Sequence, residues 1–315
     1  MAQMTPLLSL CIPIYNRLPY LERQLARMLE DKELFEEQIQ LIISDNCSTD
    51  DLKSCCEKYQ KQGLNFTYHR NETNLGPDGN FDWCFHHAEG KYVWLLGSDD
   101  IPVKGMLRQI LEILEEGDYG LVHLSTSPRV ERLHLYHNDN EILADINVWI
   151  TFMSANIIRT DSLQDYDLKE YIGSYMIQVP AYLNACLSAE NNALVYLGQP
   201  FEAGSDAANN GGYNLFRVFV ENLFSMYQQF VDEGMLSKQT FERVKKKEYK
   251  AFLVSHIVDL LLFRKKSSFD TQNAWSLLRR HYGTKLYAYY FLINNIFSRF
   301  SKKIKWSLID NGQFV

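Results

Sequence analysis

The stretch LLSLCIPIYNR, residues 7–17, joins an apolar run to an abrupt polar ending. A run with so few polar residues is typical of a parallel strand that is buried on both faces. Two later runs, residues 39–44 and 92–96, end in the same way, in SDNCSTD (44–50) and in GSDD (97–100). Because an open α/β sheet binds its ligand at the carboxyl ends of its strands, we expect the three polar endings to meet at one site.

Strand and helix patterns alternate around these endings. Helices are predicted at residues 18–29, at about 50–62, in a segment that includes residues 83 and 88, and at about 104–115. Strands are expected at 65–70, 119–125 and 193–197, whereas the polar segment 128–140 predicts a loop or an excursion. The alternation predicts an α/β fold, with a mostly parallel sheet flanked by helices.

From about residue 213 the pattern becomes helical, with aromatic and aliphatic residues at helical spacing. We therefore predict an α/β domain over 1–212, made of an N-terminal part (1–118) and a second part (119–212). A helical C-terminal module is expected to follow over 213–315.

Composition limits the function classes. The 315 residues are 46% hydrophobic and 13% aromatic, which suffices for a packed core. A net charge of -7 argues against a general nucleic-acid binder. The six cysteines show no CxxC pairing, which favours a reducing compartment. The chain contains no run of about 18 apolar residues, so a membrane-spanning helix is not predicted. We expect a cytoplasmic protein.

The residue types in the three endings point to a nucleoside diphosphate. Asp99 and Asp100 need a divalent cation, Mg²⁺ or Mn²⁺, between their charges and a diphosphate. Tyr15 offers a flat face to a base, and Asp45 and Asn46 can bond to a base or ribose edge. The alternatives are that the two aspartates cap a helix in a surface turn, that Tyr15 is a packed aromatic, and that Asp45 forms only an Asx turn.

Residues from about 7 to 113 resemble the nucleotide-sugar-binding half of family 2, GT-A-type glycosyltransferases. In that family the first strand ends in Pro-x-Tyr-Asn, the second in Asp-Asp-x-Ser-x-Asp, and the fourth in Asp-x-Asp followed by a further acid. The matching residues here are Pro13, Tyr15, Asn16, Asp45, Ser48, Asp50, Asn74, Leu75, Gly76, Asn80, Ala88, Gly90 and Tyr92. The chain departs from the pattern at Asn46, which replaces an acid, and at Gly97, which stands where the triplet begins.

The resemblance implies a GT-A fold with a helical extension and a metal-dependent, inverting transfer from a nucleotide-sugar donor. It implies that Asp99 and Asp100 hold Mn²⁺ or Mg²⁺. The implied donor-binding residues are Pro13, Tyr15, Asn16, Arg17, Asp45, Asn46, Asn74, Gly76, Asn80, Ser98 and Asp99. Arg17 is equally compatible with phosphate binding and with a solvated surface position.

The GSDD ending is also similar to the abequosyltransferase-like subgroup of bacterial surface-polysaccharide synthesis. That similarity implies a glycan or a lipid-linked saccharide as the acceptor, in capsule, O-antigen or related synthesis. Two rival functions stay open: a catalytically degenerate binding scaffold, and a sugar-phosphate nucleotidyltransferase, although the latter usually has a glycine-rich, basic first loop. Neither GxGxxG nor GxxxxGK[ST] occurs in the chain.

The catalytic base is not evident from the sequence. An inverting transfer needs a carboxylate that removes the proton of the acceptor hydroxyl, and the family often supplies it from a Glu-Asp pair, which is absent between residues 172 and 185. The candidates are Glu170, Glu190, Glu202 and Asp206. Each is also explained as an exposed charge or a turn residue.

The C-terminal segment gives a second signal. Residues 287–300 are rich in Tyr, Phe, Leu and Ile and lead into Arg299, Lys302, Lys303, Lys305 and Trp306. This composition fits peripheral contact with anionic lipid at the inner face of the membrane. The alternative is a core helix with a basic solvent face. A homo-oligomer is also compatible with the sequence.

Overall fold

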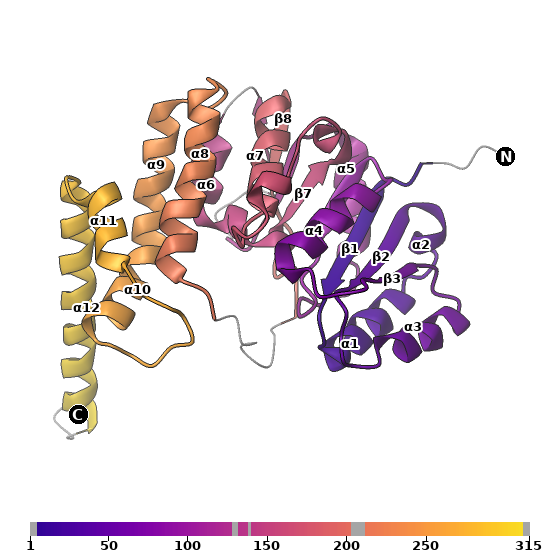
Figure 1. The fold of residues 1–315 in the computed structure, drawn as a ribbon, viewed down its shortest axis with the longest axis horizontal. Helices are drawn as coiled ribbons and strands as arrows, with labels where there is room; N and C mark the ends of the chain where they lie inside the picture. The colour runs from indigo at the N-terminus through magenta and orange to yellow at the C-terminus, as the bar shows by residue number, and fades with distance from the viewer. Residues whose placement is uncertain (1–4, 128–131, 138–139, 203–211, 311–315) are drawn as a thin grey trace.

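The fold is built around one central sheet with helices on both faces (Figure 1). The computed structural model describes residues 5–127, 132–137, 140–202 and 212–310, with side chains through residue 299. Within these residues the sheet has eight strands in the order β3-β2-β1-β4-β7-β5-β8-β6. The predicted α/β class and the helical C-terminal region are confirmed.

The N-terminal half of the sheet is parallel. It contains β1 (Leu8–Ile14), β2 (Ile39–Asp45), β3 (Thr67–Arg70) and β4 (Tyr92–Leu95). Every residue of β1 is buried, as expected for a central strand covered on both faces. The register pairs Ile14 with Asp45 and Asp45 with Arg70, so the carboxyl ends of β1, β2 and β3 lie at one level.

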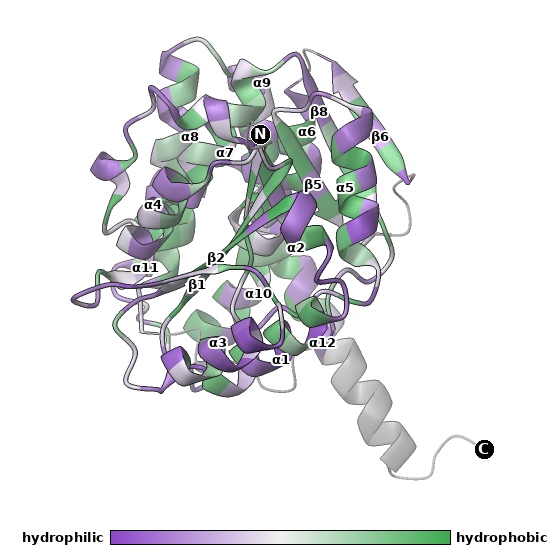
Figure 2. Ribbon diagram, turned by 90° about the vertical axis from the view of Figure 1, so that its right-hand side faces the viewer, coloured by the Kyte–Doolittle hydropathy of each residue, from purple (hydrophilic) through white to green (hydrophobic). Residues whose placement is uncertain are grey.

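Helices cover both faces of this half. They are α1 (Leu18–Leu29), α2 (Leu34–Glu37), α3 (Leu52–Lys61), α4 (Gly76–His87) and α5 (Met106–Glu116). Leu21, Leu25 and Met28 give α1 its buried face, at the spacing that predicted the helix. Figure 2 shows hydrophobic residues along the central strands and hydrophilic residues on the outer turns of helices such as α3.

The second half of the sheet is mixed. It contains β5 (Leu121–Ser125), β6 (Leu133–His137), β7 (Asn156–Arg159) and β8 (Asn191–Tyr196), of which β7 and β6 run antiparallel to their neighbours. The prediction of a loop over 128–140 is wrong for Leu133–His137. This edge strand buries only Tyr136 and follows a polar segment, and its pairing with β8 makes the strand.

Short helical segments connect the late strands. They are α6 (Glu141–Ile146), the 3₁₀ turns η1 (Asn147–Thr151), η2 (Met153–Ala155), η3 (Thr160–Leu163) and η4 (Lys169–Tyr171), and then α7 (Gln178–Ser188). Side chains of α7 such as Tyr182 are fully buried against the sheet and the C-terminal helices. This helix therefore joins the two parts of the molecule.

The C-terminal region is helical from Arg217 onward. It contains η5 (Arg217–Asn222), α8 (Leu223–Asp232), α9 (Lys238–Glu248), η6 (Tyr249–Leu253), α10 (Val254–His256), η7 (Ile257–Leu262), α11 (Ala274–Tyr282) and α12 (Leu286–Asp310), where η5, η6 and η7 are π-helical. Phe224 of α8 and Tyr182 of α7 belong to the same hydrophobic cluster. The boundary at 212 stays a prediction, since the core is continuous across it.

None of the helices that the structure describes is long and apolar enough to traverse a lipid bilayer.

Candidate functional site

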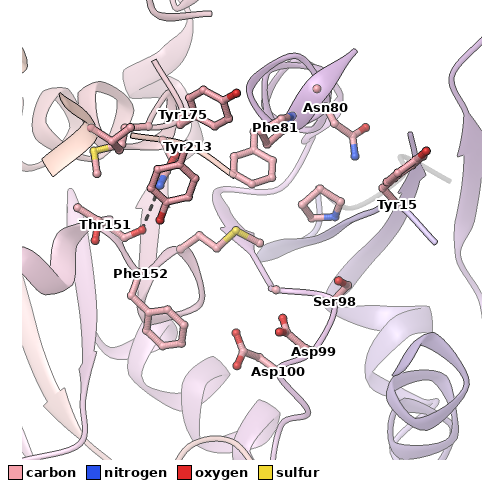
Figure 3. Close-up of a pocket in the computed structure, with 18 of the residues that line it drawn as sticks. Tyr15, Asn80, Phe81, Ser98, Asp99, Asp100, Thr151, Phe152, Tyr175 and Tyr213 are labelled. Carbon is pink, nitrogen blue, oxygen red and sulfur yellow. Dashed lines mark hydrogen bonds between the residues drawn. The ribbon is translucent and has the colours of Figure 1, made fainter. Parts of the chain in front are cut away.

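A cavity of about 1120 Å³ opens at the carboxyl ends of β1, β2 and β4 (Figure 3). The residues from the first hundred that line it include Pro13, Tyr15, Arg17, Asn46, Asn74, Gly76, Asn80, Ser98, Asp99 and Asp100. The three polar strand endings therefore meet, as the sequence predicts. Two of the expected residues, Asn16 and Asp45, do not line the cavity.

Asn16 shapes the turn after β1 instead of lining the cavity. Both Asn16 and Arg17 have left-handed backbone conformations, with φ of 60° and 66°. The Asn16 side-chain oxygen accepts a hydrogen bond from the Thr49 amide at 2.8 Å, and the Asn16 amide donates to Ser48 Oγ at 2.7 Å. Ser48 and Thr49, which follow β2, thus hold the turn at Asn16 in place. The side chain of Tyr15, just before this turn, is 46% exposed on the cavity wall.

Asp45 is fully buried behind that wall. Its Oδ1 accepts a hydrogen bond from the Ser48 amide at 2.8 Å, and its Oδ2 accepts from Tyr68 Oη and Arg70 Nη1, both at 2.7 Å. Burial raises the pKa of Asp45, but these hydrogen bonds outweigh burial and hold the pKa below its usual value. Asp45 does not line the cavity, because β3, which the motif does not include, supplies partners for its carboxylate.

A network of amides forms the next part of the wall. Asn46 Nδ2 donates to Asn74 Oδ1 at 2.9 Å, and Asn71 Nδ2 donates to the side-chain oxygens of Asn46 and Asn80 at 3.2 and 3.0 Å. Ser44 Oγ donates to Asn80 Oδ1 at 2.7 Å. An amide at position 46 both donates and accepts here, which a carboxylate could not do. Sequence analysis missed Asn71, which links the two sides of the network.

Asp99 and Asp100 have different environments although they are adjacent. Asp99 lines the cavity with its side chain 29% exposed, and Arg17 Nη1 lies 3.1 Å from its Oδ1. The same Arg17 nitrogen donates to Ser98 Oγ at 3.1 Å. Figure 3 shows both carboxylates next to Ser98 at one end of the cavity.

Asp100 is held by Ser154, a residue of the η2 turn that precedes β7. Its Oδ2 accepts a hydrogen bond from Ser154 Oγ at 2.5 Å. Burial raises the pKa of Asp100 to about 6, and the Ser154 hydroxyl opposes part of that rise. A Cβ atom on Gly97 would lie 2.6 Å from Asp100 Oδ2 and 3.1 Å from Ser154 Oγ. The glycine at the start of the triplet therefore leaves room for this contact.

The carboxylate chemistry fits a cation that shares its coordination with a ligand. Within the described part of the chain, no group of three or more His, Cys, Asp or Glu could hold a metal ion. Mg²⁺ is commonly bound by one or two carboxylates together with substrate phosphates. Asp99 meets that requirement, whereas Asp100 has one oxygen committed to Ser154.

The opposite end of the cavity comes from the second half of the chain. Its lining includes Trp149, Thr151, Phe152, Tyr175, Gln178, Tyr213, Phe219 and Phe252. Gln178, at the start of α7, is buried; its Nε2 donates to the Thr151 carbonyl at 3.1 Å, while its Oε1 has no hydrogen-bond partner among the described residues. Figure 3 shows Tyr175 and Tyr213 close together at this end, with Phe152 between them and the carboxylate of Asp100.

Asp78 on α4 holds the loop that carries Tyr175. Its Oδ2 accepts hydrogen bonds from the amides of Gly173 and Tyr175, each at 2.8 Å. Burial raises the pKa of Asp78, although these amides counteract the rise. Sequence analysis did not identify Asp78, and only its place in the GPDGN segment, just after the Asn74 turn, offers a signal.

The sequence-based candidates for the base do not line the cavity where they are described. Glu170 is exposed on η4, and Glu190 is exposed before β8, at the amino edge of the sheet. Glu202 bonds to Arg27 at 2.6 Å. Asp206 lies outside the described residues.

Residues 9–177 match the family described as glycosyl transferase family 2. This matched segment covers more than half of the chain. The chain belongs to this family. The expected family resemblance is thus confirmed, and the second half of the cavity extends beyond the matched segment.

Curated relatives align over shorter stretches. The chain is 43% identical over 103 residues to the abequosyltransferase RfbV of Salmonella typhimurium, covering 32% of this chain and 30% of the relative. It is 27% identical over 188 residues to the poly(ribitol-phosphate) β-N-acetylglucosaminyltransferase TarS of Staphylococcus aureus, covering 56% of this chain and 32% of the relative. The alignments thus span about a third of these relatives.

Solved structures share the fold. S. aureus TarS 1-349 in complex with UDP-GlcNAc superposes with a TM-score of 0.56 at 19% identity, covering 79% of this chain and 72% of TarS. The mannosyltransferase PcManGT from Pyrobaculum calidifontis, in complex with GDP-Man and Mn²⁺, superposes with a TM-score of 0.53 at 13% identity, covering 92% and 86%. The predicted GT-A architecture is confirmed by these likenesses.

Proposed function

We propose that this protein transfers a sugar from a nucleotide-sugar donor to a hydroxyl of a glycan or lipid-linked saccharide, in bacterial surface-polysaccharide synthesis. The observation that carries the proposal is the single cavity that joins two chemically different ends. One end has Tyr15, Arg17 and Asp99, and the other has aromatic side chains and Gln178. A donor and an acceptor placed at these ends would meet within the cavity.

The donor end suits a nucleoside diphosphate. Tyr15 presents an exposed ring for a base, and the amides of Asn46 and Asn74 lie beside it on the cavity wall. Arg17 supplies a positive charge next to Asp99, which suits a diphosphate and the cation that accompanies it. The relatives' names support this choice, since TarS has been captured with UDP-GlcNAc and PcManGT with GDP-Man.

Asp99 is the residue that would hold Mn²⁺ or Mg²⁺, with Asp100 as its buried neighbour. A bound divalent cation would stabilise the negative charge that develops on the leaving diphosphate. Arg17 already neutralises Asp99 in the structure and would add a second positive charge at this end. We further propose inversion at the anomeric carbon, by direct displacement.

The acceptor end suits a sugar. Phe152, Tyr175 and Tyr213 offer flat faces that can pack against the apolar faces of pyranose rings. Gln178 lines this end, and its buried Oε1 has no partner among the described residues, so a small movement of the side chain would offer that oxygen to an acceptor hydroxyl. An amide cannot remove a proton, so Gln178 would orient the acceptor, and Asp206 stays the sequence-based candidate for the base.

Nucleotide-dependent stabilisation tests the donor site. A ligand that binds only the folded state stabilises it by about 2.7 kcal/mol at a hundred times its Kd. UDP, GDP, CDP and TDP, each with and without Mn²⁺, are compared on the wild type, on Asp99→Ala and on the control Asp118→Ala. Asp118 lies before β5 and is 61% exposed, away from the cavity.

We expect one nucleotide to stabilise the wild type and Asp118→Ala in a Mn²⁺-dependent way, and to lose that effect in Asp99→Ala. Stabilisation that is equal in both variants would contradict the role of Asp99. No stabilisation by any nucleotide would contradict the donor site.

A catalytically degenerate scaffold is the second candidate, because the carboxylates that line the cavity within the described residues are Asp99 and Asp100 alone. Donor hydrolysis separates the two functions. Slow release of free sugar from the stabilising nucleotide's sugar donor supports the enzyme, whereas binding with no turnover over hours supports the scaffold.

A further inference from the structure

Helix α12 presents a second apolar face that no described element covers. Its inner face is buried, with Ala288 4% exposed and Phe291 packed against the core. On the outer face Leu286 is 85%, Tyr290 63% and Ile293 51% exposed. Spacings of four and three residues place these three on one stripe. A helix that is apolar on all sides is normally buried by protein or lipid. We therefore expect the outer stripe to contact a partner.

The inner contacts fix the direction of this stripe. Arg299 of α12 and Lys265 both form ion pairs with Asp259 of η7. Lys250 of η6 lies 5.7 Å from the centre of the Phe291 ring. These contacts hold the inner face against η6 and η7, so the outer stripe cannot turn into the core. Figure 1 shows α12 as the outermost layer, at the end of the molecule opposite β3.

Positive charge gathers beside the helix. The exposed segment after η7 contains Arg264, Lys265 and Lys266 in succession. Three further lysines, at 302, 303 and 305, follow in the sequence of α12. The whole chain carries a net charge of -7, so this cluster is positive in a protein that is negative overall. Exposed tyrosine and aliphatic residues next to clustered lysines are the composition of a helix that lies in an anionic lipid interface.

We propose that α12 and the basic segment 264–266 dock this protein on an anionic lipid surface. The outer stripe enters the interfacial region, and the basic residues contact lipid headgroups. The same region adjoins the cavity, because Ala251 and Phe252 of η6 line the cavity while Lys250 of η6 contacts α12. The docking itself does not depend on the proposed transfer reaction.

Vesicle co-sedimentation of the full chain tests the proposal. Vesicles of phosphatidylcholine with one third phosphatidylglycerol are compared with pure phosphatidylcholine, at low and high salt. The wild type is expected to bind the anionic vesicles and to be released by salt, because attraction to anionic lipid is screened. Tyr290→Ser/Ile293→Ser should weaken binding at least tenfold. Arg264→Gln/Lys266→Gln should weaken it about 30-fold, from ~1 kcal/mol for each basic residue.

Leu135→Ser is the matched control, since Leu135 is an exposed apolar residue on the edge strand β6. Thermal unfolding and nucleotide-dependent stabilisation of every variant show whether it is folded, and they report on the donor site independently of lipid binding. Equal binding to both vesicle types, no binding, or unchanged binding by Tyr290→Ser/Ile293→Ser would overturn the proposal. A wild-type dimer that Tyr290→Ser/Ile293→Ser converts to a monomer, without vesicle binding, would assign the stripe to a second copy of the chain.

Discussion

Replacing Asp45 by Asn tests whether this carboxylate holds the donor end together or contacts the ligand. Asp45 accepts three hydrogen bonds, from Ser48, Tyr68 and Arg70. Asparagine keeps one acceptor oxygen and introduces an NH₂ group. In either orientation of the amide, that group faces the Ser48 amide or the pair of donors from β3. At least one hydrogen bond is therefore replaced by a contact between two donors.

The expected loss of stability follows from these contacts. A hydrogen bond to a charged group contributes about 1.5–3 kcal/mol. The Arg70 side chain is 43% exposed, so water screens its ion pair and lowers its contribution. We expect Asp45→Asn to lower the free energy of unfolding by about 2–4 kcal/mol, mainly through the contacts of Ser48 and Tyr68.

The pH dependence adds a second signature. The hydrogen bonds hold the pKa of Asp45 in the folded state below its ordinary value of about 3.9. Stability from a lowered carboxyl pKa is present above the unfolded-state pKa and is lost as pH falls through the folded-state pKa. The difference between wild type and Asp45→Asn should therefore be largest near neutral pH and shrink below about pH 4.

Urea unfolding from pH 7 to pH 3.5 measures this difference, and titration of the stabilising nucleotide measures ligand binding. Because Asp45 does not line the cavity, nucleotide affinity of the folded variant should stay within about threefold of the wild type. A change in unfolding free energy below about 0.5 kcal/mol, together with a large loss of nucleotide affinity, would refute the reasoning and indicate that Asp45 contacts the nucleotide directly.

Three further outcomes are expected. Burial lowers the pKa of His123, next to Asn156, to about 4, so stability should fall by about 3 kcal/mol as pH drops from about 6.5 to 4, and His123→Gln should remove that slope in urea unfolding. Gly90→Ala would place a Cβ 2.6 Å from the Ser9 backbone nitrogen, so it should cost about 1–3 kcal/mol and lower the Tm; an unchanged Tm would contradict the close packing. Gln178→Leu loses one hydrogen bond but removes a buried unpaired oxygen, so its unfolding free energy should change by less than about 1 kcal/mol, whereas a larger loss would assign Gln178 a structural role.

Sequence reasoning predicted the elements whose signal is local. The α1 helix has the predicted bounds because its apolar spacing and the proline in its first turn lie within twelve residues. The β6 strand was missed, because its residues are mostly exposed and only the pairing with β8 makes them a strand. Buried parallel strands such as β1 thus leave a clear signal in their own sequence, whereas β6 is a strand because it pairs with β8.

The same distinction holds within the candidate site. Sequence motifs predicted that Tyr15, Asn46 and Asp99 come together, because polar residues at the carboxyl ends of neighbouring parallel strands must share one edge of the sheet. They could not show that Asp45 turns away toward Arg70, nor that Asp99 faces the cavity. Those outcomes depend on partners from other strands and loops.

By itself, the sequence determined the family, the alternation of strands and helices in the N-terminal part, and the motifs that meet at the carboxyl ends of β1, β2 and β4. The tertiary structure decided which carboxylate is open to a ligand, since Ser154, 54 residues away from Asp100, engages one carboxylate and leaves Asp99 to line the cavity. It also decided which face of α12 is left exposed. The physical reason is that burial and hydrogen bonding depend on residues distant in the chain, and their contacts are set only when the sheet and the helices pack together.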